Sequence, residues 1–241
     1  MQKPPNPFYT GLFGWKLDTM NVGEGGPYTF FVNADKGFGG IVQTDPAHGI
    51  PPHWSSYLEA VPTVDEACEQ ILAVGGSVLQ PGMDIPGIGR MAFAIDPQGA
   101  RINSFKSAQS DDTPPSGYSG AKGGISWVEL MATDPTAAVA FYCSLTGWTS
   151  YDIDMGMGPY TVMQDGDVML AGIMALPDGV TQPAWMIYFG IVQETMEEAL
   201  VELKRFGGQD GMGPMEIPTV GTIAAVADST GAWFNLMRSS D

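Results

Sequence analysis

Much of this sequence occurs twice along the chain, and the repeat restricts the folds that the chain can adopt. The matching landmarks lie 131 to 133 residues apart. They are Phe8-Tyr9 with Phe141-Tyr142, Gly14-Trp15 with Gly147-Trp148, Gly26-Pro27-Tyr28-Thr29 with Gly158-Pro159-Tyr160-Thr161, Trp54 with Trp185, Gly75-Gly76 with Gly207-Gly208, Ile85-Pro86 with Ile217-Pro218, and Asp96-x-x-Gly99 with Asp228-x-x-Gly231. A nearly constant offset over so many positions predicts two copies of one structural module.

The sequence between the two copies, residues 107–123, is rich in Ser, Gly, Pro and Asp and predicts a linker. We therefore place one module at 1–106 and the other at 124–241. In the second module, alternating residues 125–133 predict a strand. Asp134-Pro135 is typical of a helix start, and Gly147 is suited to that helix's end. Two short strands are expected near 160–164 and 168–174, and a third at 185–192.

Two later helices are expected, one in each module, because Thr-x-x-Glu occurs at 63–66 and at 195–198. Each module then ends in strands around its Asp-x-x-Gly turn. The predicted fold class is α+β, with a strand-helix-strand-strand-strand order and an extra helix between the later strands.

The first module reaches Phe8-Tyr9 after only seven residues, MQKPPNP, whose three prolines cannot supply a strand or a helix interior. We predict that this module lacks its first strand and most of its first helix. The sheet would then have an open edge. A symmetric homodimer that covers this edge is the expectation, and folding of the linker 107–123 over the edge is the alternative.

The chain has 241 residues, 44% of them hydrophobic, which is enough for one large or two small cores. Ten Lys and Arg against 27 Asp and Glu give a net charge of −17, which disfavours nucleic acid and membrane surfaces as partners. We find neither a signal peptide nor an apolar run of about 18 residues, so a cytoplasmic location is expected. Cys68 and Cys143 fall in predicted helices and are interpreted as small buried apolar residues.

Three groups of residues resemble a known family: Trp127-x-Glu129-Leu130 leading to Thr133-Asp134, Phe141-Tyr142 with Gly147-Trp148, and the Asp-x-x-Gly turns. In this order they resemble the vicinal oxygen chelate superfamily, which includes glyoxalase I, bleomycin-resistance proteins and extradiol dioxygenases. The likeness is greatest to tandem two-module glyoxalase-like proteins of bacteria. It implies paired βαβββ modules whose curled sheets form an incomplete barrel around one cavity.

The resemblance also implies where a metal would be ligated. The corresponding positions here hold Trp127, Asn103, Asn235, Ser56 and Ile187. Neutral amides, a hydroxyl, an indole and an alkyl group cannot neutralise a dehydrated divalent cation. His48 and His53 lie in a Pro-rich loop and match no ligand position. We therefore expect neither a metal nor another cofactor.

The remaining cavity residues suggest a binding site. Trp127 and Glu129 share one strand face, which makes Glu129 a candidate general base, with a structural carboxylate as the alternative. Asn103 and Asn235 would orient a ligand carbonyl or hydrogen-bond to each other. Arg101 is a candidate carboxylate clamp or a surface ion pair, as is Arg90. The remaining ligand-binding candidates are Ser56 and two aromatic side chains that would line the cavity or belong to the core, Trp54 and Trp185.

We therefore expect a metal-independent protein that binds a small apolar or aromatic molecule, by sequestration or as a cofactor-free lyase or isomerase that uses Glu129. One alternative is a metal-dependent lyase or dioxygenase of the same superfamily. The other is a structural or interaction protein whose own side chains fill the cavity.

Overall fold

A computed structural model describes residues 7–21, 27–44, 47, 49–59, 62–108, 122–155 and 158–240. The chain forms two compact units. Unit 1 combines Met1–Trp54, Thr113–Ser126 and Ile187–Asp241, and unit 2 combines Ser55–Asp112 with Trp127–Met186. Each unit therefore contains part of both sequence repeats. The boundaries 1–106, 107–123 and 124–241 remain a prediction about the repeats, and the compact units cut across them.

Each repeat contains two successive groups of elements, and each group consists of one helix and several strands. The first repeat consists of α1 (Phe8–Phe13), β1 (Lys16–Asn21), β2 (Pro27–Asn33) and β3 (Lys36–Ile41), then β4 (Tyr57–Glu59), α2 (Val64–Ala73), β5 (Ser77–Ile85), β6 (Gly89–Ile95) and β7 (Arg101–Ser107). The second consists of β8 (Ile125–Ala132), α3 (Pro135–Thr146), β9 (Thr149–Asp154), β10 (Pro159–Asp165) and β11 (Val168–Ala175), then β12 (Ala184–Gly190), α4 (Met196–Arg205), β13 (Gln209–Asp210), β14 (Met215–Ile217), β15 (Gly221–Ala227) and β16 (Trp233–Ser239).

Within the described residues, the first helix of the first repeat is shorter than its counterpart in the second, as predicted. This helix, α1, has 6 residues, whereas the matching α3 has 12. In the described part of the first repeat, no strand precedes α1, and the following sheet has the order β1-β2-β3. The matching strands of the second repeat continue to a fourth, β8, which pairs with β11 in parallel. The α+β fold class predicted from the sequence is therefore correct, and the described residues of the first repeat, from Pro7 onward, contain no strand before α1.

Local sequence signals account for where the helices begin and end. The Asp134 side chain accepts a hydrogen bond from the Ala137 backbone N–H, with Pro135 as the first helical residue, and Gly147 ends α3 at φ 76°. Thr63 caps α2 through the Glu66 N–H. Thr195 and Glu198 form the predicted capping box of α4. Each cap satisfies a backbone N–H that the helix itself leaves without a partner.

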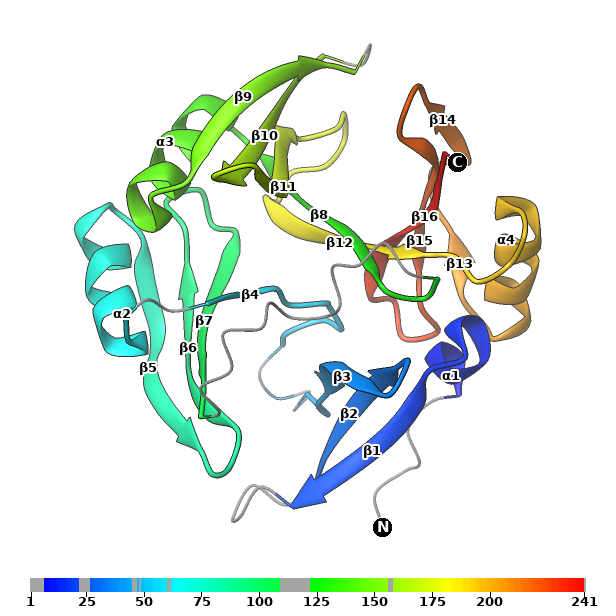
Figure 1. The fold of residues 1–241 in the computed structure, drawn as a ribbon, viewed down its shortest axis with the longest axis horizontal. Helices are drawn as coiled ribbons and strands as arrows, with labels where there is room; N and C mark the ends of the chain where they lie inside the picture. The colour runs from blue at the N-terminus through cyan, green and yellow to red at the C-terminus, as the bar shows by residue number, and fades with distance from the viewer. Residues whose placement is uncertain are drawn as a thin grey trace. The chain divides into compact units, whose positions relative to one another are not determined.

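Unit 2 is built on two groups of strands, ordered β4-β7-β6-β5 and β8-β11-β10-β9. One buried cluster joins the helix-facing residues of both groups: Ile71, Ala94, Ala100, Ile102, Leu130, Ala132, Ala138, Phe141, Tyr142, Met163, Ala171 and Ile173. Helices α2 and α3 supply its outer layer, and Figure 1 shows α2 alongside β5 and β6. Full burial of each large apolar side chain contributes about 1.5–3 kcal/mol to stability. The opposite faces of these strands point away from both helices, and we call them the helix-distal face of unit 2.

Unit 1 has an aromatic core. Its buried rings are Phe8, Tyr9, Phe13, Trp15, Phe31, Tyr188, Phe189 and Phe234. Trp15 stacks on Phe13 with ring centroids 4.6 Å apart, and its indole N–H donates to the Gly123 carbonyl over 2.6 Å. The Asn33 amide also donates, to the Lys122 carbonyl over 3.2 Å. The described end of the predicted linker therefore packs against residues of the first repeat within this unit.

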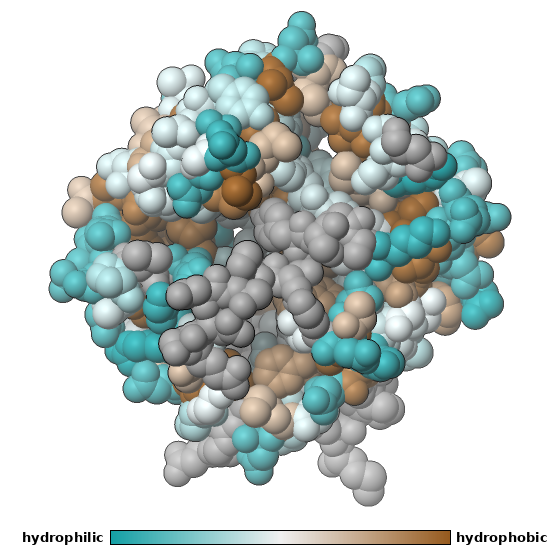
Figure 2. All heavy atoms as spheres, viewed as in Figure 1, coloured by the Kyte–Doolittle hydropathy of each residue, from teal (hydrophilic) through white to brown (hydrophobic). Residues whose placement is uncertain are grey.

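Hydrophilic residues occupy much of the face shown in Figure 2, with apolar patches between them. Exposed apolar side chains include Leu72, Val168 and Val201. Within the described ranges, no helix is both long enough and apolar enough to cross a membrane.

Candidate ligand-binding site

A hydrogen-bonded triad in unit 2 explains three of the repeated landmarks. The Tyr142 hydroxyl donates to the Asp96 carboxylate over 3.1 Å, and the Trp185 indole N–H donates to that hydroxyl over 3.0 Å. The other Asp96 oxygen accepts from the backbone N–H groups of Gln98 and Ala100. Burial, followed by the charge of Asp96, raises the pKa of Tyr142 well above its usual value. The triad ties α3 of one repeat to the Asp-x-x-Gly turn of the other.

Unit 1 contains the same triad with the repeats exchanged. The Tyr9 hydroxyl donates to Asp228 over 2.7 Å, and the Trp54 indole N–H donates to Tyr9 over 3.0 Å. Burial and the charge of Asp228 raise the pKa of Tyr9. The indole N–H groups of both Trp54 and Trp185 thus have tyrosine partners, and their predicted contact with a ligand remains a prediction.

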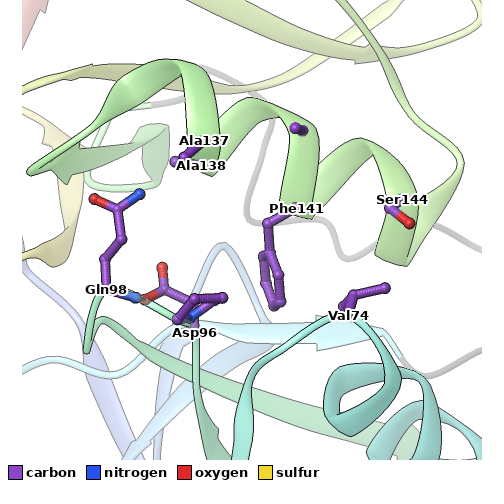
Figure 3. A pocket seen from close by; sticks show the side chains of 9 residues that line it. Val74, Asp96, Gln98, Ala137, Ala138, Phe141 and Ser144 are labelled. Carbon is purple, nitrogen blue, oxygen red and sulfur yellow. Dashed lines mark hydrogen bonds between the residues drawn. The ribbon is translucent and has the colours of Figure 1, made fainter.

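A surface pocket of about 380 Å³ lies beside the unit 2 triad (Figure 3). It is lined by Val74, Asp96, Pro97, Gln98, Ala137, Ala138, Ala140, Phe141 and Ser144. Its principal polar groups already have hydrogen-bond partners. Asp96 accepts hydrogen bonds from Tyr142 and from the backbone N–H groups of Gln98 and Ala100. Gln98 exchanges two hydrogen bonds with the Asp134 backbone, at 2.7 and 2.8 Å. This pocket therefore presents little unsatisfied polarity to a ligand.

The helix-distal face of β7 carries an unusual group. Ile102 packs into the core beside α2, so Asn103, the next residue, points to the other face. Asn103 is 1% exposed, and neither its amide nitrogen nor its amide oxygen has a hydrogen-bond partner among the described residues. Phe93 lies opposite it on β6, and Phe105 follows it on β7, both half-buried. The result is an unpaired amide among apolar side chains.

A second network lies on the helix-distal face of the β8–β11 strands. The Trp127 indole N–H donates to the Tyr160 hydroxyl over 2.7 Å, and Tyr160 is hydrogen-bonded to Glu129. Glu129 is 6% exposed and Tyr160 is 8% exposed. Burial, followed by the charge of Glu129, raises the pKa of Tyr160. Leu130 and Ala132 of the same strand face α3, which places Trp127 and Glu129 together on the other face as the alternation predicts.

The sequence identified Tyr160 as a repeated landmark but not as a site residue, and it did not identify the glycine that the Tyr160 ring covers, Gly172. A Cβ at Gly172 would collide with the Tyr160 hydroxyl, and Gly40 has the same relation to Tyr28 in unit 1. The sequence contained a signal for this pair, because Tyr28 and Gly40 recur as Tyr160 and Gly172 at an offset of 132 residues. Unit 1 does not have the matching Trp and Glu in its described residues, because no strand that would carry them precedes α1 there.

The other candidate residues are spread over several elements of the two units. Asn235, which is 7% exposed, lies on β16 of unit 1. Arg101 is half-buried on the same face of β7 as Asn103. The Ser56 hydroxyl is buried just before β4 without a partner in the described residues. Arg90 binds Asp65 and Asp84, each at 2.9 Å, which makes it an ion-pair residue rather than a carboxylate clamp.

The loop histidines and the cysteines add little to the site. His53 lies with its Nδ1 2.8 Å from the Pro51 carbonyl, and His48 lies outside the described residues. Cys68 is buried in α2, and Cys143 is half-buried in α3.

The donor set for a metal does not fit. Across the described part of the chain, no group of three or more His, Cys, Asp or Glu is placed to hold a metal ion. The positions that the resemblance identifies hold an indole, two amides, a hydroxyl and an alkyl group, at Trp127, Asn103, Asn235, Ser56 and Ile187. The carboxylate nearest to Trp127 along β8 is Glu129, and it is bound to Tyr160.

Comparison with solved structures relates the fold to known enzymes. The Mn(II)-bound glyoxalase from Novosphingobium aromaticivorans matches with a TM-score of 0.53 at 16% identity, over 98% of this chain and 80% of that one. An extradiol ring-cleaving dioxygenase from B. fuscum matches with a TM-score of 0.62 at 13% identity, over 100% of this chain and 70% of that one. At these identities the likeness concerns the fold alone.

Sequence comparison goes further. No family model matches the chain. "Putative glyoxylase CFP32" of Mycobacterium bovis is 31% identical over 98% of this chain and 90% of its own length. "Anthracycline biosynthesis protein DnrV" of Streptomyces peucetius is 29% identical over 96% and 86%. Together with the fold, the first of these matches shows that the chain belongs to the vicinal oxygen chelate superfamily, among its glyoxalase-like members.

Proposed function

We propose that unit 2 binds a small, largely apolar molecule on its helix-distal face without a metal ion. The observation that carries this proposal is Asn103, whose amide is buried without a partner in the described chain. Buried polar groups nearly always have partners, and each one without a partner costs about 1–3 kcal/mol. A ligand carbonyl and hydroxyl would satisfy the amide nitrogen and oxygen together.

The surroundings of Asn103 support a flat, apolar ligand. The apolar residues on the same sheet face include Met91, Phe93 and Phe105, all half-buried, and Arg101 shares the face. Aromatic and methionine side chains with a few polar groups are typical of small-molecule sites. One relative is named for anthracycline biosynthesis, and this name favours a polycyclic aromatic ligand for the present chain.

Asn103 on β7 and Glu129 on β8, both on the helix-distal face of unit 2, suggest two modes of action. The protein would either sequester the ligand or act as a cofactor-free lyase or isomerase. In an isomerase, the Glu129 carboxylate would remove a proton from the carbon beside a ligand carbonyl. The Asn103 N–H would stabilise the enolate oxygen, and the proton would return from Glu129 to a second carbon. No oxidant or reductant is needed.

Binding of 1-hydroxyanthraquinone, whose hydroxyl lies beside a carbonyl, tests this proposal. Isothermal titration should give a saturable site in metal-free protein. Asn103→Leu should weaken the affinity about tenfold or more, because the hydrogen bonds to the amide are lost. Asn21→Leu, at an exposed asparagine of β1 in unit 1, should leave it unchanged.

Three results would count against the proposal. Equal loss of affinity in both variants would place the site elsewhere. Binding that appears only after a divalent metal is added would favour the metal-dependent alternative. A protein that binds no aromatic probe would favour a cavity filled by its own side chains.

A further inference from the structure

We propose that Tyr160, held over Gly172, positions Glu129 as a hydrogen-bond acceptor, so that unit 2 selects neutral hydroxylated aromatic molecules over carboxylates. This inference rests on the proposed function and adds to it a positioning residue and a class of ligand. Three observations support it: the glycine at position 172, the hydrogen bonds among Trp127, Tyr160 and Glu129, and the related Tyr28–Gly40 pair in unit 1.

The glycine allows Tyr160 to reach Glu129. Gly172 lies opposite Glu129 in the parallel ladder between β11 and β8. A side chain at this position would occupy the space of the Tyr160 ring and hydroxyl, since a Cβ built there collides with both. Tyr160 comes from β10, on the far side of β11, so its side chain must cross β11 to meet Glu129. Only a glycine on β11 leaves room for that crossing.

The direction of the network is fixed by chemistry. An indole N–H can only donate, so the Tyr160 oxygen accepts from Trp127. Tyr160 has a single proton, and it is directed to Glu129. The network therefore ends in a carboxylate, which accepts hydrogen bonds and repels anions. The net charge of −17 adds to this repulsion.

Unit 1 contains a tyrosine and glycine pair that can be compared with the pair in unit 2. Tyr28 lies over Gly40 as Tyr160 lies over Gly172. Residues matching Trp127 and Glu129 are missing from the described part of that unit, which has no strand before α1. The tyrosine and glycine pair alone is therefore a feature of the fold, and the carboxylate acceptor belongs to unit 2. Gly40→Ala is consequently a matched control for Gly172→Ala.

Three probes with one ring system test the selectivity: naphthalene, 1-naphthol and 1-naphthoate, titrated at pH 7. We expect the unmodified chain to bind 1-naphthol at least about tenfold more tightly than 1-naphthoate, since hydrogen bonds to charged groups are strong. Tyr160→Phe and Gly172→Ala should each reduce this ratio toward one. Gly40→Ala should keep it. Tyr160→Phe retains the ring, so it remains informative if Gly172→Ala does not fold.

A double-mutant cycle separates positioning from a purely structural role. If Tyr160 acts through Glu129, Tyr160→Phe should change the 1-naphthol affinity little once Glu129→Gln is present. Additive effects of the two substitutions would overturn the proposal, as would a ratio that Tyr160→Phe leaves unchanged. Binding of all three probes with equal affinity would also overturn it, while leaving the proposed function standing. Failure of the unmodified chain to bind any probe would remove both.

Discussion

At the scale of single residues, Asn103 is a position where the side chain lowers the stability of the fold. It lies in the middle of a strand with both amide atoms buried and without partners in the described chain. An apolar side chain of similar size would avoid the cost of desolvating the amide. Stability and ligand binding therefore oppose each other at this residue.

Asn103→Leu should raise the free energy of unfolding by about 1–3 kcal/mol, because it removes the unpaired amide. Urea unfolding followed by circular dichroism measures the change. A loss of stability would contradict this expectation and would indicate that the amide has a structural partner.

Glu129 can act on a ligand or on the fold, and one substitution separates the two roles. We expect Glu129→Gln to weaken binding of a hydroxylated ligand about tenfold, because a neutral amide is a poorer acceptor than a carboxylate. The melting temperature should change little. A loss of ~1–3 kcal/mol in stability with unchanged binding would assign Glu129 a structural role instead. If neither quantity changes, Glu129 has neither role.

At the scale of secondary-structure elements, the two Trp–Tyr–Asp triads hold helices to turns from the other repeat. Tyr9 and Asp228 are 219 residues apart, yet their hydroxyl and carboxylate are 2.7 Å apart. Both tyrosine hydroxyls lie in the core with a carboxylate as acceptor. The repeated landmarks of these triads therefore have a structural role, whereas the Trp127–Tyr160–Glu129 network has no counterpart among the described residues of the first repeat.

The triads predict how stability depends on alkaline pH. The folded-state pKa values of Tyr9 and Tyr142 are raised, whereas an unfolded tyrosine titrates near about 10. Their contribution is therefore complete below pH about 10 and is lost as the pH rises above it, because only the unfolded chain releases the protons. Urea midpoints should fall steeply between about pH 10 and 11.5.

Tyr142→Phe serves as the control for that pH dependence. The variant should be less stable at pH 7, because Asp96 and Trp185 lose their partner, and its stability should fall less steeply above pH about 10. The absorbance of tyrosinate gives an independent measurement. If all 8 tyrosines of the intact fold titrated near their usual pKa, the prediction would be wrong.

Local signals allowed the elements to be predicted, whereas long-range pairing did not follow from them. Asp134, Thr63 and Thr195 begin their helices as predicted, because a cap acts within one turn. Strands β5 and β9 were not predicted: Pro81 and Gly82 interrupt the pattern of β5, whereas the alternation of polar and apolar residues at 150–154 in β9 was a signal that the sequence did offer. The assembly of each unit from both repeats depends on contacts such as Tyr9 with Asp228, which no local pattern encodes. The network at Glu129 was half predicted, since alternation placed Trp127 but not Tyr160.

At the scale of the whole molecule, the first expectation concerns metal content. Within the described residues, the ligand positions hold no combination of carboxylate, imidazole and thiolate that suits a divalent cation. Purified protein should contain far less than one equivalent of Zn, Ni, Mn or Fe by elemental analysis. Dialysis against a chelator should leave the melting temperature unchanged. About one tightly held metal per chain would refute this expectation and our alignment of the ligand positions.

The second expectation concerns assembly. The first repeat begins with a sheet of three strands, and an uncovered sheet edge favours pairing with another chain. We predict a symmetric homodimer, which light scattering at micromolar concentration would detect as about twice 25.6 kDa. The contacts of Lys122 and Gly123 with Asn33 and Trp15 show how far the described linker reaches toward this repeat. A monomer would indicate that the chain covers its own edge.

Each unit combines part of the first repeat with part of the second, and this arrangement also determines when the chain can fold during its synthesis. Unit 2 needs residues up to Met186, and unit 1 needs the last strand, β16. A ribosome that has made the whole first repeat has therefore completed neither unit. Early segments such as α1 must wait for partners as distant as Asp228, 219 residues after Tyr9, which favours slow folding and dependence on chaperones. Two separately expressed repeats should each remain unfolded and should fold only after they are mixed.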